Sequence, residues 1–145
     1  MKVAQLLPEL NFGGVERGTV DLANFLVSQG HDALIISAGG VLESELDTEV
    51  KNLRIPISKK SLSALMQFKA LKKIILEERP DIVHVRSRFP AWIYLLATRG
   101  LPNHQKPVLV CVMDEKYLKN YYQILDLLRN NNISAEIFLD TKKNL

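Results

Sequence analysis

The sequence has few of the residues that build disulfide-bonded or metal-bound scaffolds. Its 145 residues include one cysteine, Cys111, and three histidines, His31, His84 and His104, which lie far apart along the chain. A single cysteine excludes a disulfide framework, and no pair of His or Cys residues has the spacing of a zinc site. We therefore expect no metal ion, and the lack of disulfides fits a reducing, cytoplasmic compartment.

Long hydrophobic runs are also missing. None approaches the roughly 20 residues of a membrane-spanning helix, and the short apolar run that ends at Pro8 is too short for a signal peptide. Hydrophobic residues make up 47% of the chain and charged residues 24%, which predicts one globular domain. The net charge of +3 mildly favours anionic partners, such as phosphates or an anionic membrane face, but does not by itself indicate nucleic acid.

Short apolar runs alternate with amphipathic helical patterns. Continuous apolar strands are typical of a sheet that is covered on both faces. The alternation predicts an α/β fold with a parallel sheet and helices on both of its faces. The expected strands are residues 3–7, 33–36, 53–57, 82–85, 108–112 and 135–139. The expected helices are residues 15–28, 61–78, 90–98 and 116–129.

The segment 100–107, rich in turn residues, divides the chain into two parts. Residues 1–104 form the expected main domain. Residues 105–145 suffice for one β-α-β unit, which is too small for an independent domain. We expect this unit to complete the same sheet, with 108–112 pairing in parallel beside an N-terminal strand; the alternative is a poorly ordered tail.

A glycine-rich segment follows the first expected strand and precedes a helix. Gly13 and Gly14 allow a ligand to approach the backbone, the helix start offers free N–H groups, and Arg17 adds a planar fork suited to phosphate. The segment matches neither the dinucleotide-binding pattern nor a Walker loop. It is therefore either an anion site or a tight turn beside a solvated arginine.

A second polar cluster lies at the end of the expected strand 82–85. If the chain stays extended, His84, Arg86 and Arg88 share one side of it. Either His84 is a general base and the arginines hold a phosphate, or His84 is a core histidine and the arginines face solvent. Since both clusters follow strands, we expect them to meet at the carboxyl edge of the sheet.

Basic residues are frequent around the expected helix 61–78. A basic amphipathic helix can lie on an anionic membrane, but the same residues form an ordinary solvated face when acidic neighbours balance them. The basic residues are Lys59, Lys60, Lys69, Lys72 and Lys73, with Glu77 and Glu78 beside them.

Several motifs in order resemble the N-terminal half of family-4 glycosyltransferases with the GT-B fold. The similarity is to the bacterial group that builds lipopolysaccharide core or related envelope glycans, and it covers residues 1–104. The motifs are residues 3–10, 13–18, 21–23, 30–31, 37–40 and 79–88.

This resemblance implies a Rossmann-like domain that holds an envelope lipid or saccharide acceptor in the cytoplasm, peripheral to the inner membrane face. Phosphate or acceptor binding would fall on Gly13, Gly14, Arg17, Ser87 and Arg88, and catalytic roles on His84 and Arg86. In the family, the strand-end segment often reads His-x-His. Here the first position is His84 and the second histidine is replaced by Arg86, which is a departure from the family pattern.

In the family, the donor-binding domain supplies the nucleotide pocket, which includes a basic residue and a Glu-x7-Glu pair. Residues 105–145 do not supply this pocket. The resemblance therefore implies no cofactor, no sugar transfer by these residues alone, and nucleotide-sugar binding only if a donor domain is supplied.

The last residues, 107–145, instead resemble the start of the anticodon-binding domain of histidyl-tRNA synthetase. The chain would then be a chimera, or a non-functional remnant of one. Acidic residues nearly balance the basic residues of this tail, which argues against strong tRNA binding. The basic residues are Lys116, Lys119, Arg129, Lys142 and Lys143, and the acidic ones Asp114, Glu115, Asp126, Glu136 and Asp140.

Overall fold

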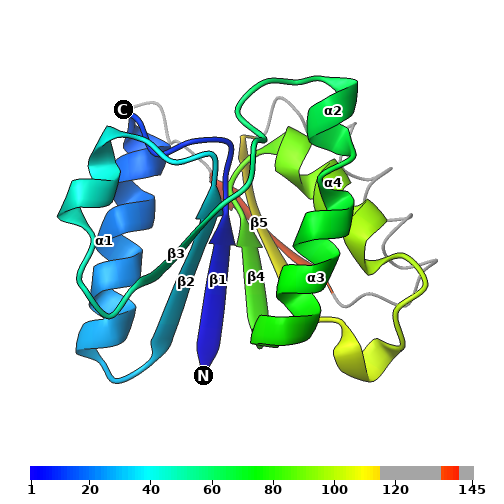
Figure 1. Ribbon diagram of the computed structural model, residues 1–145. Coiled ribbons are helices and arrows are strands. Elements are labelled where there is room, and N and C mark those ends of the chain that lie inside the picture. Colours follow the sequence, from blue (N-terminus) through cyan, green and yellow to red (C-terminus); the bar gives the residue numbers. More distant parts are fainter. Residues whose placement is uncertain (115–134, 141–145) are drawn as a thin grey trace.

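The computed structural model describes residues 1–114 and 135–140, which form a six-stranded sheet of order β3-β2-β1-β4-β5-β6 (Figure 1). Every neighbouring pair of strands is parallel, as the alternation of strands and helices predicts. The strands are β1 (Lys2–Leu6), β2 (Asp32–Ser37), β3 (Lys51–Arg54), β4 (Ile82–Val85), β5 (Val108–Asp114) and β6 (Ala135–Asp140). The helices are α1 (Gly14–Ser28), α2 (Leu62–Leu65), α3 (Phe68–Glu78) and α4 (Arg88–Thr98), with 3-10 turns η1 (Val41–Glu45) and η2 (Asn103–Gln105).

Helices cover both faces of the sheet, as predicted. Alternate residues of β2 point to opposite sides: Ala33 and Ile35 pack with α1, whereas Leu34 and Ile36 pack in the larger core with α3 and α4. Figure 1 shows α1 on one side of the strands and α3 and α4 on the other. The continuous apolar strands therefore reflect burial on both faces.

Three of the expected elements differ most from the structure. The third strand is Lys51–Arg54 rather than 53–57, because β3 is an edge strand whose own side chains are only partly buried; the apolar Ile55 and Ile57 are buried beyond its end. The helix expected over 61–78 is two helices, because the chain turns at Met66 and Gln67. The helix expected over 90–98 begins at Arg88, since a proline is tolerated in a first turn, where N–H groups have no helical partner.

The segment after residue 104 continues the same sheet in the described part of the chain. Strand β5 pairs in parallel with β4, which confirms the pairing expected for residues 108–112, and β6 pairs with β5. The Tyr94 hydroxyl of α4 is buried and donates a hydrogen bond to the Pro107 carbonyl at 3.0 Å. The expected helix 116–129 lies outside the described residues, and the division into domains at residue 104 stays a prediction.

We expect Tyr94→Phe to lower the free energy of unfolding by about 1–2 kcal/mol, because it leaves the buried Pro107 carbonyl without its donor. Chemical denaturation followed by circular dichroism measures this change. Trp92→Phe is the control, since Trp92 lies on the same helix and is 44% exposed. Equal stability of Tyr94→Phe and the parent would mean that the segment entering β5 does not depend on this contact.

Candidate functional site

The candidate site lies where the order of the strands reverses. Strands β1 and β4 are neighbours at the centre of the sheet, but the chain leaves β1 for α1 on one face and β4 for α4 on the other. At such a point the two connections diverge and leave a crevice at the carboxyl edge of the sheet, which is where open α/β sheets bind ligands. Both polar clusters expected from the sequence lie at this edge.

The glycine-rich turn starts α1. Gly13 is the N-cap residue, and its carbonyl accepts a hydrogen bond from the Arg17 amide at 2.9 Å. The Glu16 carboxylate folds back against Gly13, so closely that a side chain at position 13 would collide with it. Around Gly14 there is open space for a side chain. The start of the helix, where an anion would be favoured, thus already has a carboxylate of the chain beside it.

This placement of Glu16 predicts that Glu16→Gln strengthens the binding of inorganic phosphate at the start of α1. The expected gain is about two- to fivefold, the range that one charge at a helix N-terminus contributes. The shift of the Gly14 amide resonance during a phosphate titration measures it. Asp21→Asn, five residues further along α1, is the matched control. An equal gain in affinity in both variants would mean that the change in net charge, and not the position of Glu16, causes the effect.

The Arg17 guanidinium is not an unpaired fork. Its two terminal nitrogens pair with the Glu45 carboxylate at the end of η1, with Nη2 at 2.9 Å from Oε1. Both side chains are more than two-fifths exposed, so the pair contributes little stability. The hydrogen bond and charge of Arg17 lower the pKa of Glu45. A phosphate would therefore have to compete with Glu45 for Arg17.

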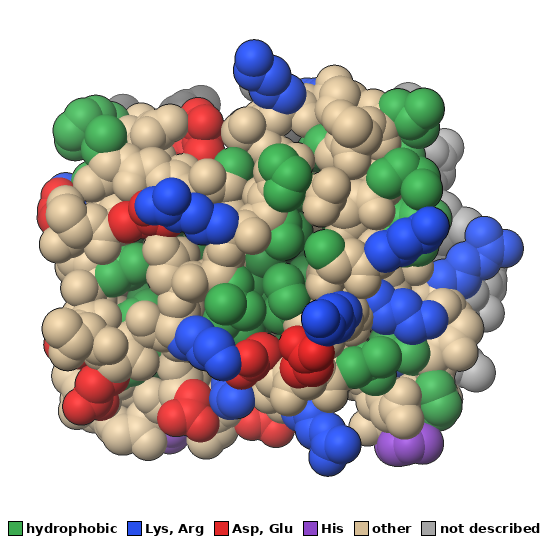
Figure 2. Space-filling model, viewed as in Figure 1, with side chains coloured by type: hydrophobic (Ala, Val, Ile, Leu, Met, Phe, Trp, Pro, Cys, Tyr) green, Lys and Arg blue, Asp and Glu red, His purple; other side chains and the backbone are tan. Residues whose placement is uncertain are grey.

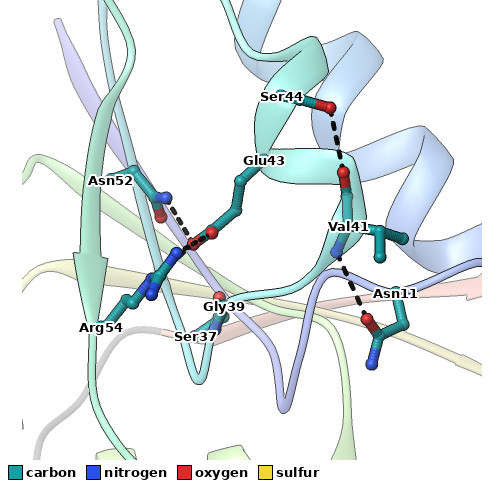
Figure 3. Close-up of polar contacts among 8 residues, drawn as sticks. All are labelled: Asn11, Ser37, Gly39, Val41, Glu43, Ser44, Asn52 and Arg54. Atoms are coloured by element: carbon teal, nitrogen blue, oxygen red, sulfur yellow. Dashed lines mark hydrogen bonds and ion pairs between the residues drawn. The ribbon is translucent and has the colours of Figure 1, made fainter.

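The loop after β2 supports the loop after β1 along its length. Backbone hydrogen bonds join Ala38 to Pro8, Leu10 to Gly39, and Leu42 to Leu10, at 2.9–3.0 Å. The Asn11 side chain accepts a further bond from the Val41 amide (Figure 3). The loop that carries the glycine-rich turn is therefore hydrogen-bonded to a second loop at the same edge of the sheet.

Glu43 of η1 anchors this second loop. Its carboxylate accepts hydrogen bonds from Asn52 at 2.7 Å and from Arg54 at 2.9 Å, both on β3 (Figure 3). The hydrogen bond from Arg54 contributes most to lowering the pKa of this largely buried carboxyl group. Gly39 has φ +87°, and a side chain there would lie 2.8 Å from Arg54 Nε. Position 39 therefore has to be glycine for Arg54 to reach Glu43.

Arg86 joins the two clusters. Its backbone amide donates to the Leu6 carbonyl at 2.9 Å, which extends the pairing of β4 with β1 by one residue. Its side chain reaches the start of α1, where Nη2 donates to the Val15 carbonyl at 3.3 Å. The turn at Gly13–Gly14 and the end of β4 therefore lie at one edge of the sheet.

His84 is a buried side chain on the α1 side of β4. It is 9% exposed, lies opposite Gln5 in the register of β1 and β4, and is followed on the same side by Arg86. Burial, and then the positive charge of Arg86, lower its pKa to about 4. Neutral at pH 7, this imidazole has the protonation state that a base needs. Its Nε2 has no partner among the described residues.

Ser87 and Arg88 follow at the start of α4. Ser87 is the N-cap residue and Arg88 is the first helical residue, with an exposed side chain. The alternation expected to place Arg88 beside His84 and Arg86 fails, because the chain becomes helical at residue 88. The expected binding and catalytic roles of all these residues stay predictions.

Within the described residues no group of His, Cys, Asp or Glu side chains could hold a metal ion. The same part of the chain has no helix long and apolar enough to cross a membrane. Burial raises the pKa of the Cys111 thiol to about 12, so the thiol is not an activated nucleophile.

The chain is similar to known proteins in sequence and in fold. Residues 12–130 match the model of Glycosyltransferase Family 4. The chain belongs to this family. It is also similar to the crystal structure of a glycosyltransferase from Rickettsia africae ESF-5, with 29% identity and a TM-score of 0.65. That similarity covers 94% of this chain and 42% of the Rickettsia chain, and the family-4 residues here correspond to an N-terminal region.

A second similarity has a different character. A stretch of 43 residues is 72% identical to the histidine–tRNA ligase of Pelagibacter ubique (strain HTCC1062). It covers 30% of this chain and 9% of the ligase. The short match at high identity agrees with the resemblance to histidyl-tRNA synthetase expected from the sequence.

Proposed function

We propose that this family-4 chain is the acceptor-side half of a nucleotide-sugar-dependent glycosyltransferase of lipopolysaccharide-type envelope glycan biosynthesis. In this proposal the edge formed by Gly13, Gly14 and the end of β4 holds a phosphate-bearing lipid or saccharide acceptor. The supporting observation is that Arg86 contacts Val15, because this brings together the glycine-rich turn and the β4 end. Amide groups at a helix start suit a phosphate.

The roles in this proposal differ from residue to residue. The N–H groups at Gly14 and its neighbours would bind the phosphate, with Ser87 and Arg88 contributing from α4. His84 would remain neutral and would act on the acceptor hydroxyl only after a movement that exposes it, since it is buried in this structure. Arg17 would contribute only if the ligand displaces Glu45.

We expect the 145 residues to bind acceptor but not to transfer sugar. Holding donor and acceptor in reacting geometry is worth roughly 7–11 kcal/mol, and stabilisation of the departing diphosphate is usually another large contribution. The chain spans less than half of the Rickettsia glycosyltransferase that it matches, so a donor site on the remaining part of such a protein would be absent from the assay.

Release of nucleoside diphosphate, measured with nucleotide sugars and lipid A-like acceptors, tests this expectation. Release at background, together with acceptor-induced shifts of the Gly13 and Gly14 amides, supports the proposal. Turnover that disappears in Arg86→Ala would contradict the inactivity, and an acceptor that leaves both amides unchanged would contradict the binding site.

A peripheral membrane contact is part of the same proposal. Figure 2 shows Lys and Arg side chains gathered on the side of the molecule that carries α3. Exposed Leu62 and Met66 lie on and beside the neighbouring α2, at 76% and 45% exposure. Basic and apolar side chains together suit an anionic membrane surface, and such a contact would bring the acceptor edge near an envelope lipid.

The match to histidine–tRNA ligase supports a second candidate, a tRNA-binding fragment. Electrophoretic mobility shift with tRNA separates the two. Binding that persists at 200 mM salt would favour the second candidate, because a few non-specific phosphate contacts weaken steeply over this range.

A further inference from the structure

A single residue, Arg86, holds both ends of the loop that carries the glycine-rich turn. This loop leaves β1 after Leu6 and enters α1 at Gly14. The Arg86 amide donates to the Leu6 carbonyl at 2.9 Å, and its guanidinium donates to the Val15 carbonyl at 3.3 Å. Backbone and side chain of one residue therefore fix the distance between the end of the strand and the start of the helix.

The sequence of α1 makes room for this contact. Gly18 lies one turn after Gly14, and a side chain there would place its Cβ 3.1 Å from Arg86 Nη2. That separation is shorter than an ordinary van der Waals contact. The guanidinium can lie against the backbone of α1 because position 18 has no side chain. A larger residue would push the guanidinium away from the Val15 carbonyl.

A neighbouring contact from β1 makes the same kind of attachment. Gln5 Nε2 donates to the Thr19 carbonyl at 2.8 Å, in the buried interior. The carbonyls of Val15 and Thr19 are one helical turn apart, so Gln5 of β1 and Arg86, the residue after β4, contact successive turns of α1. The Thr19 hydroxyl also donates to the Val15 carbonyl at 2.8 Å.

We propose that Arg86 is a positioning residue, which fixes the first turn of α1 and with it the Gly13–Gly14 turn over the carboxyl edge of the sheet. This use of the turn rests on the proposed function. In it, the phosphate of the acceptor binds to the turn and not to Arg86. A planar guanidinium suits the role better than an ammonium group, because it is rigid and more weakly hydrated when half-buried.

Amide hydrogen exchange in the 145-residue protein tests the proposal. Arg86→Met keeps the length of the side chain but removes its donors, and Gly18→Ala keeps Arg86 but displaces it. In both variants we expect exchange of the Arg17, Gly18 and Thr19 amides to rise about tenfold, which is the loss expected for one hydrogen bond from a charged donor. The last turn of α1 should not change. Arg99→Met, at the far end of α4, is the matched control.

Unchanged exchange at Arg17, Gly18 and Thr19 in Gly18→Ala overturns the proposal, whether or not Arg86→Met folds. A second measurement separates positioning from direct binding. During titration with inorganic phosphate, the Arg86 Nε–H resonance should stay in place while the Gly14 amide shifts; a saturable shift of Nε–H would make Arg86 a phosphate ligand and overturn the assignment. If phosphate moves neither resonance but the exchange rates rise as expected, the positioning role stands and the proposed anion site fails.

Discussion

The protein is expected to lose about 3 kcal/mol of stability through His84 as the pH falls from about 6.5 to about 4. The folded state lowers the pKa of this imidazole from 6.5 to about 4, chiefly because it is buried. Between these values the unfolded chain binds a proton that the folded chain does not, so acid favours unfolding; the loss is complete below about pH 4. Each unit of pKa shift corresponds to about 1.4 kcal/mol.

Urea denaturation at a series of pH values measures this loss, with His84→Gln as the comparison. Carboxyl groups such as Glu43, whose pKa is lowered in the folded state, also reduce stability in acid, so the decisive quantity is the difference between the two pH profiles. His104→Gln replaces an exposed imidazole and is the matched control for the substitution. Parallel profiles for the parent and His84→Gln would show that His84 accepts a proton in the folded protein without cost.

Gly40→Ala is expected to destabilise the fold by about 3 kcal/mol or more, the upper range for overpacking against atoms that cannot move. A Cβ at this position would lie 2.8 Å from the Asn11 amide nitrogen and even closer to the Leu10 carbonyl group. These are backbone atoms, and the hydrogen bonds that join Leu10 to Gly39 and Leu42 hold them in place. Relief would require the two loops of the carboxyl edge to separate.

The midpoint and slope of chemical denaturation measure this effect. Gly14→Ala is the matched control, because a Cβ there meets no atom within 4 Å and alanine favours a helix. We expect that control to be neutral or slightly stabilising. A Gly40→Ala protein as stable as the control would mean that the two loops move apart at little cost.

The parts of the fold that the sequence predicts well depend on local patterns. The apolar run of β4 and the amphipathic pattern of α1 fix those elements, and Gly30 adopts φ +78° where a helix end was expected. The edge strand β3 was misplaced because a partly buried strand carries no apolar signal of its own. The break at Met66 and Gln67 carries no local signal, because both residues favour helices and both keep helical φ and ψ angles in the structure.

The site was predictable in position but not in its contacts. Both polar clusters follow strands, so their shared edge followed from topology. The pairing of Arg17 with Glu45 and the contact of Arg86 with Val15 join residues far apart in the chain, and no spacing rule reveals them. Glu16 is different, because a carboxylate in the first turn of a helix is a signal that the sequence alone carries.

The position of β1 at the centre of the sheet has a consequence for the order of folding. This strand is synthesised before the other described strands, and β2 can pair with one of its edges soon afterwards, but its other neighbour, β4, follows only after α3. Until then, the nascent chain exposes a row of unpaired backbone groups along an apolar strand, which is a template for pairing with other chains. A chain truncated before residue 82 would therefore be inclined to aggregate.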